Sequence, residues 1–358
     1  MAIQTQCPRR IGVLTGGGDC PGLNAVIRAV TKSLIGQCRA EVIGIEDGFL
    51  GLMERRVRPL AWDDVSGILS AGGTILGTSN SASPFHWHDA DASAQVLAYV
   101  SELGLDGLVV IGGDGTMTIA HHMAELGLPA VGVPKTIDND IACNERSFGF
   151  DTAVATVAEA LARVQTTGQS HGRVMIVETM GRYAGWIALE AGLAGAADVI
   201  LLPEVPYDVA RVAAICQERE ARRRYTLICI AEGAVPIGGQ LTVEHTVAGS
   251  PDPLRLGGVA HVLRQQLQPL VKSEVRATVL GHVQRGGAPT AFDRVLATQY
   301  GHHAVSLIRA GQWNQMVALQ GGRLCQVPLS AVAGQTRQVT ADHPLLRCAR
   351  EIGVCFGD

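Results

Sequence analysis

Eight short runs of apolar residues, separated by longer segments of helical periodicity, constrain the fold of this chain more than any other feature. The runs are RIGVLT, EVIGIE, LDGLVVIGG, AVGVP, RVMIVET, VILLPE, YTLICIAEG and VRATVLG, and helical patterns such as FDTAVATVAEALARVQ lie between them. Strands without polar alternation are typical of a parallel sheet covered by helices on both faces. The chain has more of these strand–helix units than one ordinary open sheet holds. We therefore predict an α/β protein of two lobes, each a mostly parallel sheet covered by helices.

Composition narrows the class of protein further. The chain is 47% hydrophobic with a net charge of −4, which argues against disorder and offers no basic surface for nucleic acid. The nine cysteines are scattered without a zinc spacing, which is typical of reduced thiols in a cytoplasmic protein. The N-terminal MAIQTQCPRR has no apolar signal segment. The sequence also lacks a run of about 18 apolar residues, which a membrane-spanning helix would need.

Two glycine-rich segments follow predicted strands and open predicted helices. TGGGDCPGLN (15–24) and IGGDGTM (111–117) lie where backbone N–H groups and a helix N-terminus can receive phosphate. Neither the dinucleotide pattern GxGxxG nor the Walker loop fits the first segment, because Pro21 and the pair Leu23 and Asn24 replace required residues. A plain strand–helix turn is the alternative, although three consecutive glycines exceed what such a turn requires.

Carboxylates near the second loop indicate a cation and a base. Asp114 would repel a phosphate unless a cation lay between them, and Mg²⁺ binds through one or two carboxylates plus substrate phosphates. In PKTIDNDI (134–141), an extended backbone would point Asp138 and Asp140 the same way, one towards the cation and one towards an acceptor hydroxyl. A polar turn is the alternative for this segment.

Arginines at the ends of two predicted strands indicate an acceptor that already carries phosphate. Arg173 and Arg182 flank one strand, and Arg276, His282 and Arg285 accompany another. A planar guanidinium beside glycine binds phosphate oxygens bidentately. For any one of these arginines, an ordinary surface position is the alternative.

Taken in order, these motifs resemble the 6-phosphofructokinase family. The matching stretches are GVLTGGGDCPGLNAVIRAV, GGTILGTSN, IGGDGTM, PKTIDNDI, HGRVMIVETMGRYAG, PEV, AEG and RATVLGHVQRGG, from about residue 10 to 295. The closing AREIGVCFGD is similar to the tails of the bacterial branch with Lys in PKTIDND. The resemblance implies a glycolytic kinase that phosphorylates the 1-hydroxyl of fructose 6-phosphate with Mg²⁺ as cofactor.

The resemblance also assigns roles motif by motif. It implies that Asp138 is the general base, that Arg182 is catalytic, and that Asp114 and Asp140 bind the metal ion. The implied contacts to fructose 6-phosphate are Thr136, Arg173, Met180, Gly181, Glu232, Arg276, His282 and Arg285. The implied nucleotide contacts are Gly17, Asn80, Ser81, Gly113, Gly115 and Thr116. Arg173 and Arg276 would come from a neighbouring subunit, which implies a homo-oligomer, dimer or tetramer, with shared sites.

The chain departs from the family's pattern in two places. Asn80 and Ser81 stand where an arginine usually bridges the donor and acceptor phosphates. Arg28 matches one effector-site arginine of the allosteric bacterial enzymes, but Gln165 falls where another arginine is expected. The sequence therefore does not predict the usual control by ADP or phosphoenolpyruvate.

Gly115 and Lys135 bear on the identity of the phosphoryl donor. Pyrophosphate users of the family typically have Asp and Lys at these positions, and the common ATP enzymes have Gly at both. A carboxylate at position 115 would fill the space of the α-phosphate, whereas Lys135 suits either donor, so we predict ATP. Pyrophosphate is the main alternative and ADP a smaller one.

Two other classes of function fit less of the sequence. A lipid or nicotinamide-nucleotide kinase would explain GGDGT but not TIDND, MGR and HVQRGG. A non-catalytic fructose 6-phosphate sensor would explain the missing arginine but not the presence of both Asp114 and Asp138. The partners we expect are fructose 6-phosphate, ATP and further copies of the chain, with no nucleic acid and no membrane.

The expected division of the chain follows the two lobes. We expect a nucleotide-binding lobe from residues 1–149 and about 262–312, and a sugar-phosphate-binding lobe from about 150–261 and 313–340. Residues 341–358 would then form a C-terminal helix and tail.

Overall fold

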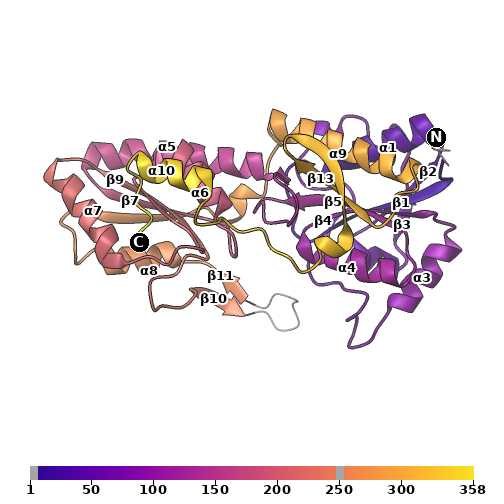
Figure 1. The fold of residues 1–358 in the computed structure, drawn as a ribbon, viewed down its shortest axis with the longest axis horizontal. Helices are drawn as coiled ribbons and strands as arrows, with labels where there is room; N and C mark the ends of the chain where they lie inside the picture. Colours follow the sequence, from indigo (N-terminus) through magenta and orange to yellow (C-terminus); the bar gives the residue numbers. More distant parts are fainter. Residues whose placement is uncertain (1–6, 247–253) are drawn as a thin grey trace. The chain divides into compact units, whose positions relative to one another are not determined.

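The computed structural model describes residues 7–246 and 254–358 and divides the chain into two compact units (Figure 1). Of the described residues, the first unit comprises 7–137, Ile141–Asp151 and Arg285–Thr336. The second comprises Asp138–Asp140, Thr152–Gln284 and Arg337–Asp358. In the described part of the chain, no helix is both long enough and apolar enough to cross a membrane.

The first unit is built on a mostly parallel sheet. Its described strands follow the order β14-β13-β5-β4-β1-β2-β3, with β6 beside β5. They are β1 (Arg10–Gly16), β2 (Glu41–Ile45), β3 (Val57–Pro59), β4 (Gly107–Gly112), β5 (Ala130–Thr136), β6 (Phe148–Gly149), β13 (Gln315–Gln320) and β14 (Arg323–Pro328). Only the edge strands β3 and β14 pair antiparallel among these. Every residue of β4 and β5 is buried, as expected for central strands covered on both faces.

Helices cover both faces of this sheet. α1 (Leu23–Ser33) and α9 (Ala291–Arg309) lie on one face, and α3 (Ser93–Glu102) and α4 (Asp114–Glu125) lie on the other (Figure 1). Shorter elements are the π-helical turn η1 (Leu34–Cys38), α2 (Phe49–Met53) and the 3-10 turns η2 (Ile68–Ser70) and η4 (Leu329–Ala331). Leu14, Val110, Val96 and Met117 are buried in the core between the sheet and the second pair of helices.

The second unit has a smaller parallel sheet in the order β12-β7-β9-β8. The strands are β7 (Val174–Thr179), β8 (Val199–Leu201), β9 (Thr226–Ala231) and β12 (Val275–Val279), and the 3-10 turn η3 (Gly281–Gln284) follows β12. α5 (Phe150–His171), α6 (Trp186–Ala194) and α10 (Pro344–Glu351) lie on one face, and α7 (Val209–Ala221) and α8 (Val259–Leu267) on the other (Figure 1). β10 (Val243–Thr246) and β11 (Leu254–Leu256) form a separate antiparallel pair.

The strand order of the first unit creates a position for ligand binding. β1 pairs with β2 on one side and β4 on the other, so the direction of the chain across the sheet reverses between β1 and β4. Gly16 of β1 lies opposite Gly112 of β4, so the two strands end at the same level. Open α/β sheets bind ligands outside the carboxyl ends of strands at such a reversal. Both glycine-rich loops leave the sheet at this point.

The predicted fold class is confirmed, but the predicted lobe boundaries differ from the observed units. Residues 262–284 belong with the second unit, because β12 extends its sheet beside β7. Residues 313–336 belong with the first unit, because β13 pairs with β5 and β14 pairs with β13. The C-terminal residues belong to the second unit rather than to a separate segment, because α10 packs on α6 and Cys355 forms a parallel β-bridge with Val199.

Candidate functional site

The first glycine loop is attached to the segment that carries Asn80 and Ser81. Gly17 has a φ of 77°, in the left-handed region that favours glycine. Its N–H donates to the carbonyl oxygen of Ser79 over 3.1 Å, and its own carbonyl accepts from the hydroxyl of Thr78. The exposed side chains of Asn80 and Ser81 therefore directly follow an anchored residue.

The end of the second glycine loop packs tightly against the first. A Cβ on Gly16 would lie 2.9 Å from Oγ1 of Thr116, and one on Gly112 would lie 2.4 Å from the Cβ of Thr116. Thr116 is buried and its side chain fills the space between these strand ends. The part of Thr116 that a nucleotide could contact is thus its backbone in the first turn of α4, not its hydroxyl.

Asp114 places a carboxylate in that same first turn of α4. Its Oδ1 is buried and has no hydrogen-bond partner among the described residues. Burial raises the pKa of this carboxyl group, and the backbone N–H of Gly334 works in the opposite direction. A carboxylate oxygen that has lost water without gaining a donor is costly, and a bound cation would satisfy it. Asp114 therefore fits the predicted Mg²⁺ site.

Gly113 and Gly115 leave space on the open side of this turn. A Cβ on Gly115 would have no heavy atom within 4 Å, and one on Gly113 would approach only the carbonyl oxygen of Lys135, at 3.5 Å. Gly115 is exposed at the N-terminus of α4. Backbone N–H groups at this end of a helix can bind phosphate.

Two cations flank the first glycine loop. Lys135 is only 3% exposed, and its Nζ donates to the carbonyl oxygen of Gly18. Arg285 donates from Nη1 to the carbonyl oxygen of Asp19 over 3.3 Å, and a Cβ on Gly18 would lie 2.9 Å from that same nitrogen. Lysine and arginine so placed make the loop favourable for a polyphosphate.

The segment with Asp138 and Asp140 is a turn, and the expectation of an extended backbone is wrong. β5 ends at Thr136, and Asn139 has a φ of 53°, in the left-handed region. Asparagine adopts this conformation more readily than most residues. The two aspartates therefore do not follow strand alternation, and other contacts must set their directions.

In the second unit, three predicted segments meet at the carboxyl ends of β7, β9 and β12. The N–H of Met180 donates to Oε1 of Gln284 over 3.2 Å, which links the MGR loop to the turn that carries His282. The N–H of Gly233 donates to the carbonyl oxygen of Gly181 over 3.2 Å, which links the same loop to Glu232. The structure thus brings Met180, Gly181, Arg182, Glu232 and His282 to one end of this sheet.

Gln284 is a residue whose role was not predicted. It is fully buried, and its Nε2 donates to the carbonyl oxygen of Gly281 over 3.0 Å while its Oε1 accepts from Met180. Gln284 connects the backbone of Met180 with that of Gly281, and nothing in the local sequence HVQRGG predicts this contact.

Arg173 and Arg276 lie at the opposite end of the same sheet. Nε of Arg173 is 2.6 Å from Oε2 of Glu274, and Nη2 of Arg276 pairs with the other oxygen of that carboxylate. The six residues of β7 separate Arg173 from the MGR loop, a span of about 20 Å at ~3.3 Å per residue. Arg276 lies opposite Met175 in the register of β12 and β7, two residues further along the strand than Arg173.

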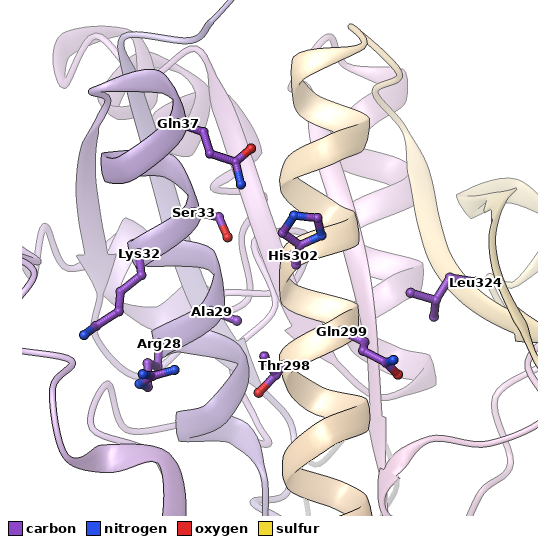
Figure 2. Close-up of a pocket in the computed structure, with 9 residues that line it drawn as sticks. All are labelled: Arg28, Ala29, Lys32, Ser33, Gln37, Thr298, Gln299, His302 and Leu324. Atoms are coloured by element: carbon purple, nitrogen blue, oxygen red, sulfur yellow. The ribbon is translucent and has the colours of Figure 1, made fainter.

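A separate groove of about 570 Å³ lies on the first unit between α1 and α9 (Figure 2). Figure 2 shows its lining residues, Arg28, Ala29, Lys32, Ser33, Gln37, Thr298, Gln299, His302 and Leu324. Nζ of Lys32 lies 4.3 Å from the ring centroid of Trp62 and 3.1 Å from Oγ of Ser66. Arg28, the match to an effector-site arginine, lines this groove, whereas Gln165 bonds the hydroxyl of Tyr225 in the second unit.

Comparison with known proteins agrees with this arrangement. The family described as phosphofructokinase matches residues 10–308. The ATP-dependent 6-phosphofructokinase 2 of Clostridium perfringens is 48% identical over 361 residues, covering 98% of this chain and 99% of that protein. The ATP-dependent 6-phosphofructokinase of Chloroflexus aurantiacus is 48% identical over 360 residues, covering 98% of each.

Solved structures show the same fold. Phosphofructokinase from Saccharomyces cerevisiae superposes with a TM-score of 0.78 at 31% identity, covering 90% of this chain and 45% of the yeast chain. The pyrophosphate-dependent phosphofructokinase from Marinobacter aquaeolei superposes with a TM-score of 0.81 at 19% identity, covering 98% of this chain and 92% of that one. At 19% identity, the similarity to the Marinobacter aquaeolei protein concerns the fold alone.

Proposed function

This chain belongs to the phosphofructokinase family, and on that premise we propose that it is an ATP-dependent 6-phosphofructokinase. It transfers the γ-phosphoryl group of ATP to the 1-hydroxyl of fructose 6-phosphate, giving fructose 1,6-bisphosphate and ADP in glycolysis. The observation that carries the proposal is the pair of glycine loops at the strand reversal, with a buried and unpartnered Asp114 oxygen in the first turn of α4. The names of relatives that are 48% identical over nearly the whole chain support ATP as the donor.

The nucleotide phosphates would bind along the glycine loops. Gly17, Gly113, Gly115 and the backbone of Thr116 would contact them, because no side chain occupies the space beside Gly115. Lys135 and Arg285 supply positive charge beside the loop. Asn80 and Ser81 would contact the donor in place of the usual arginine, through the segment anchored on Gly17.

Asp114 and Asp140 would hold Mg²⁺. When bound, this ion neutralises charge on the phosphate oxygens during transfer. The unsatisfied oxygen of Asp114 supports the assignment, since a lone buried carboxylate oxygen needs a positive partner. A cation with only one or two protein carboxylates, completed by substrate phosphates, is the usual arrangement for Mg²⁺.

Asp138 would act as the general base. It accepts the proton of the sugar 1-hydroxyl as that oxygen bonds to the γ-phosphorus and the bond to the β,γ-bridging oxygen breaks, so that ADP leaves. Arg182 would stabilise the charge on the phosphoryl group in transfer. Thr136, Met180, Gly181, Glu232, His282 and Arg285 would hold the sugar phosphate.

Arg173 and Arg276 would bind the sugar phosphate of a neighbouring subunit. Arg173 lies about 20 Å along β7 from the MGR loop of its own chain, and Arg276 lies opposite Met175 near the same end of the sheet, which supports this assignment. The enzyme would then be a homo-oligomer, dimer or tetramer, with shared sites. We also infer a cytoplasmic location from the scattered cysteines of a glycolytic enzyme.

The donor is tested by supplying ATP, ADP and pyrophosphate separately in a coupled assay for fructose 1,6-bisphosphate. We expect the highest kcat/KM with ATP. Pyrophosphate is the second candidate, because the buried Lys135 against the glycine loop suits either donor. A higher kcat/KM with pyrophosphate would replace ATP in the proposal, and binding of fructose 6-phosphate without turnover by any donor would indicate a sensor.

A further inference from the structure

A distant residue, Arg337, holds the turn that contains Asp138 and Asp140. Its Nη1 donates to the carbonyl oxygen of Asn139 over 3.0 Å, and its backbone N–H donates to the carbonyl oxygen of Asp140 over 2.7 Å. Two consecutive peptide groups of the turn are therefore bonded to one residue that lies nearly 200 positions later in the chain.

Arg337 is itself fixed by aromatic packing. Its guanidinium carbon lies 3.9 Å from the ring centroid of Trp186, and Nε1 of Trp186 donates to the carbonyl oxygen of Arg337 over 3.0 Å. Trp186 is 3% exposed and is the first residue of α6. A guanidinium stacked on a buried indole loses little further freedom when it donates its hydrogen bond.

The residues after Arg337 are bound just as firmly. Nε2 of Gln338 donates to the carbonyl oxygen of Tyr183 over 2.9 Å, and the N–H of Val339 donates to Oε1 of Glu204 over 2.9 Å. The same oxygen of Glu204 accepts from the N–H of Gly185 over 3.0 Å, just before α6 begins. Segment 337–339 is thus a rigid support rather than a loose tail.

The turn needs such a support because its backbone is unusual. Asn139 is buried and left-handed, a conformation that costs an L-residue some free energy and persists when surrounding contacts fix it. Rotation of the peptide between Asn139 and Asp140 would change the path of the backbone and with it the directions of the Asp138 and Asp140 side chains. The bond to the carbonyl oxygen of Asn139 opposes that rotation, and the bond to the carbonyl oxygen of Asp140 fixes the next peptide group.

We propose that Arg337 is a positioning residue for phosphoryl transfer: by holding the carbonyl groups of Asn139 and Asp140, it sets the direction of the Asp138 carboxylate. This inference rests on the proposed function, in which Asp138 is the base. Arg337 acts through the backbone of the turn and not through the substrate. Its removal therefore changes turnover more than substrate binding.

The central variant is Arg337→Met, which keeps an apolar stem against Trp186 but removes the donor to Asn139. We expect kcat with ATP and fructose 6-phosphate to fall by about 10- to 100-fold, since a misplacement of ~1 Å can cost ~10²-fold. KM for both substrates should stay within about threefold. Arg337→Lys keeps a charge and a donor and should recover part of the lost kcat.

A matched control separates positioning from general loss of packing. Arg350 also stacks on an aromatic ring, with its guanidinium carbon 4.9 Å from the centroid of Phe356, and pairs with Asp358 in the same unit. Arg350→Met should lower the unfolding temperature to a similar degree but leave kcat unchanged. Thermal unfolding of both variants verifies that each is folded at the assay temperature.

A double-mutant cycle with Asp138→Asn gives the decisive readout. If Arg337 acts by directing Asp138, Arg337→Met should cause no further loss of kcat in the Asp138→Asn background. An equal loss in both backgrounds, or a normal kcat for a folded Arg337→Met, would overturn the positioning role. Normal turnover of Asp138→Asn alone would instead refute the proposed base, so the two failures are distinguishable.

Discussion

Replacement of Gly115 by aspartate should lower the use of ATP more than the use of pyrophosphate, without unfolding the protein. Gly115 is exposed in the first turn of α4, and its φ is not in the left-handed region. A Cβ built there would meet no heavy atom of another residue within 4 Å, apart from its chain neighbours and the backbone of its own helix. A carboxylate near a helix N-terminus is also favourable to the helix. The protein itself should therefore tolerate the change.

The expected loss of kcat/KM for ATP in Gly115→Asp comes from charge repulsion and from the space that the new side chain occupies. Two unit charges about 4 Å apart repel by roughly 4 kcal/mol at an effective dielectric of about 20, and by about 1 kcal/mol in water. Because Gly115 is exposed, we place the repulsion between these limits, at about 2–3 kcal/mol. This corresponds to a fall of ~10²-fold in kcat/KM for ATP, whose α-phosphate would lie at this position. Pyrophosphate has no α-phosphate with a nucleoside attached, so its use should fall less.

The assay measures kcat/KM for ATP and for pyrophosphate in the wild type, Gly115→Asp and Gly115→Asn. Asparagine has nearly the same volume without the charge, so Gly115→Asn should lose less than about tenfold with ATP. The unfolding temperature of each variant confirms that the fold is intact. Full ATP activity in Gly115→Asp, or equal losses in both variants, would show that charge at this position does not select the donor.

Three further changes test the site. Asp138→Asn should lower kcat by about 10²–10⁴-fold with little change in KM for fructose 6-phosphate, and steady-state kinetics showing normal kcat would refute the base. Because burial raises the pKa of Asp114, its carboxyl group lowers stability as pH rises through that pKa. Asp114→Asn should therefore raise the unfolding temperature of the ligand-free protein at pH 7–8, lose that advantage in acid where Asp114 is protonated, and abolish turnover; an unchanged unfolding temperature across pH would contradict this. Arg276→Ala should raise KM for fructose 6-phosphate about 10- to 100-fold, the worth of one charge-assisted hydrogen bond, and hybrids with Asp138→Asn should regain activity if sites are shared.

The central strands could be predicted from sequence because burial on both faces leaves a distinct pattern. β4 is apolar throughout and β5 is apolar up to Pro134, and the strands end at Gly112 and Thr136. α9 was not predicted, although it has 19 residues. It packs against both α1 and the sheet, so small or polar residues such as Gly301, Tyr300 and Asp293 are buried along with its apolar ones. A helix buried on several sides does not present one clear apolar stripe.

The loops of the site were predicted by position but not by conformation. Both glycine loops lie where the sequence predicted them, with Gly17 directly after β1 and Gly115 in the first turn of α4. The direction of Asp138 and Asp140 does not follow from alternation, since the backbone turns at Asn139. That turn depends on Arg337, which lies in the part of the sequence with the weakest pattern. Local patterns cannot reveal a conformation that is fixed by a contact so far along the chain.

The contact of Arg173 and Arg276 with one carboxylate is likewise visible only in the fold. The two residues are about a hundred positions apart, and the parallel register of β7 and β12 brings them to one edge, where Glu274 contacts both. One carboxylate balances only one of two guanidinium groups, so the cluster keeps a net positive charge on an exposed surface. Glu274 holds the two side chains in place at little cost, because exposed ion pairs of this kind are weak. A phosphate from a neighbouring subunit would therefore find two pre-oriented arginines and displace only weak contacts.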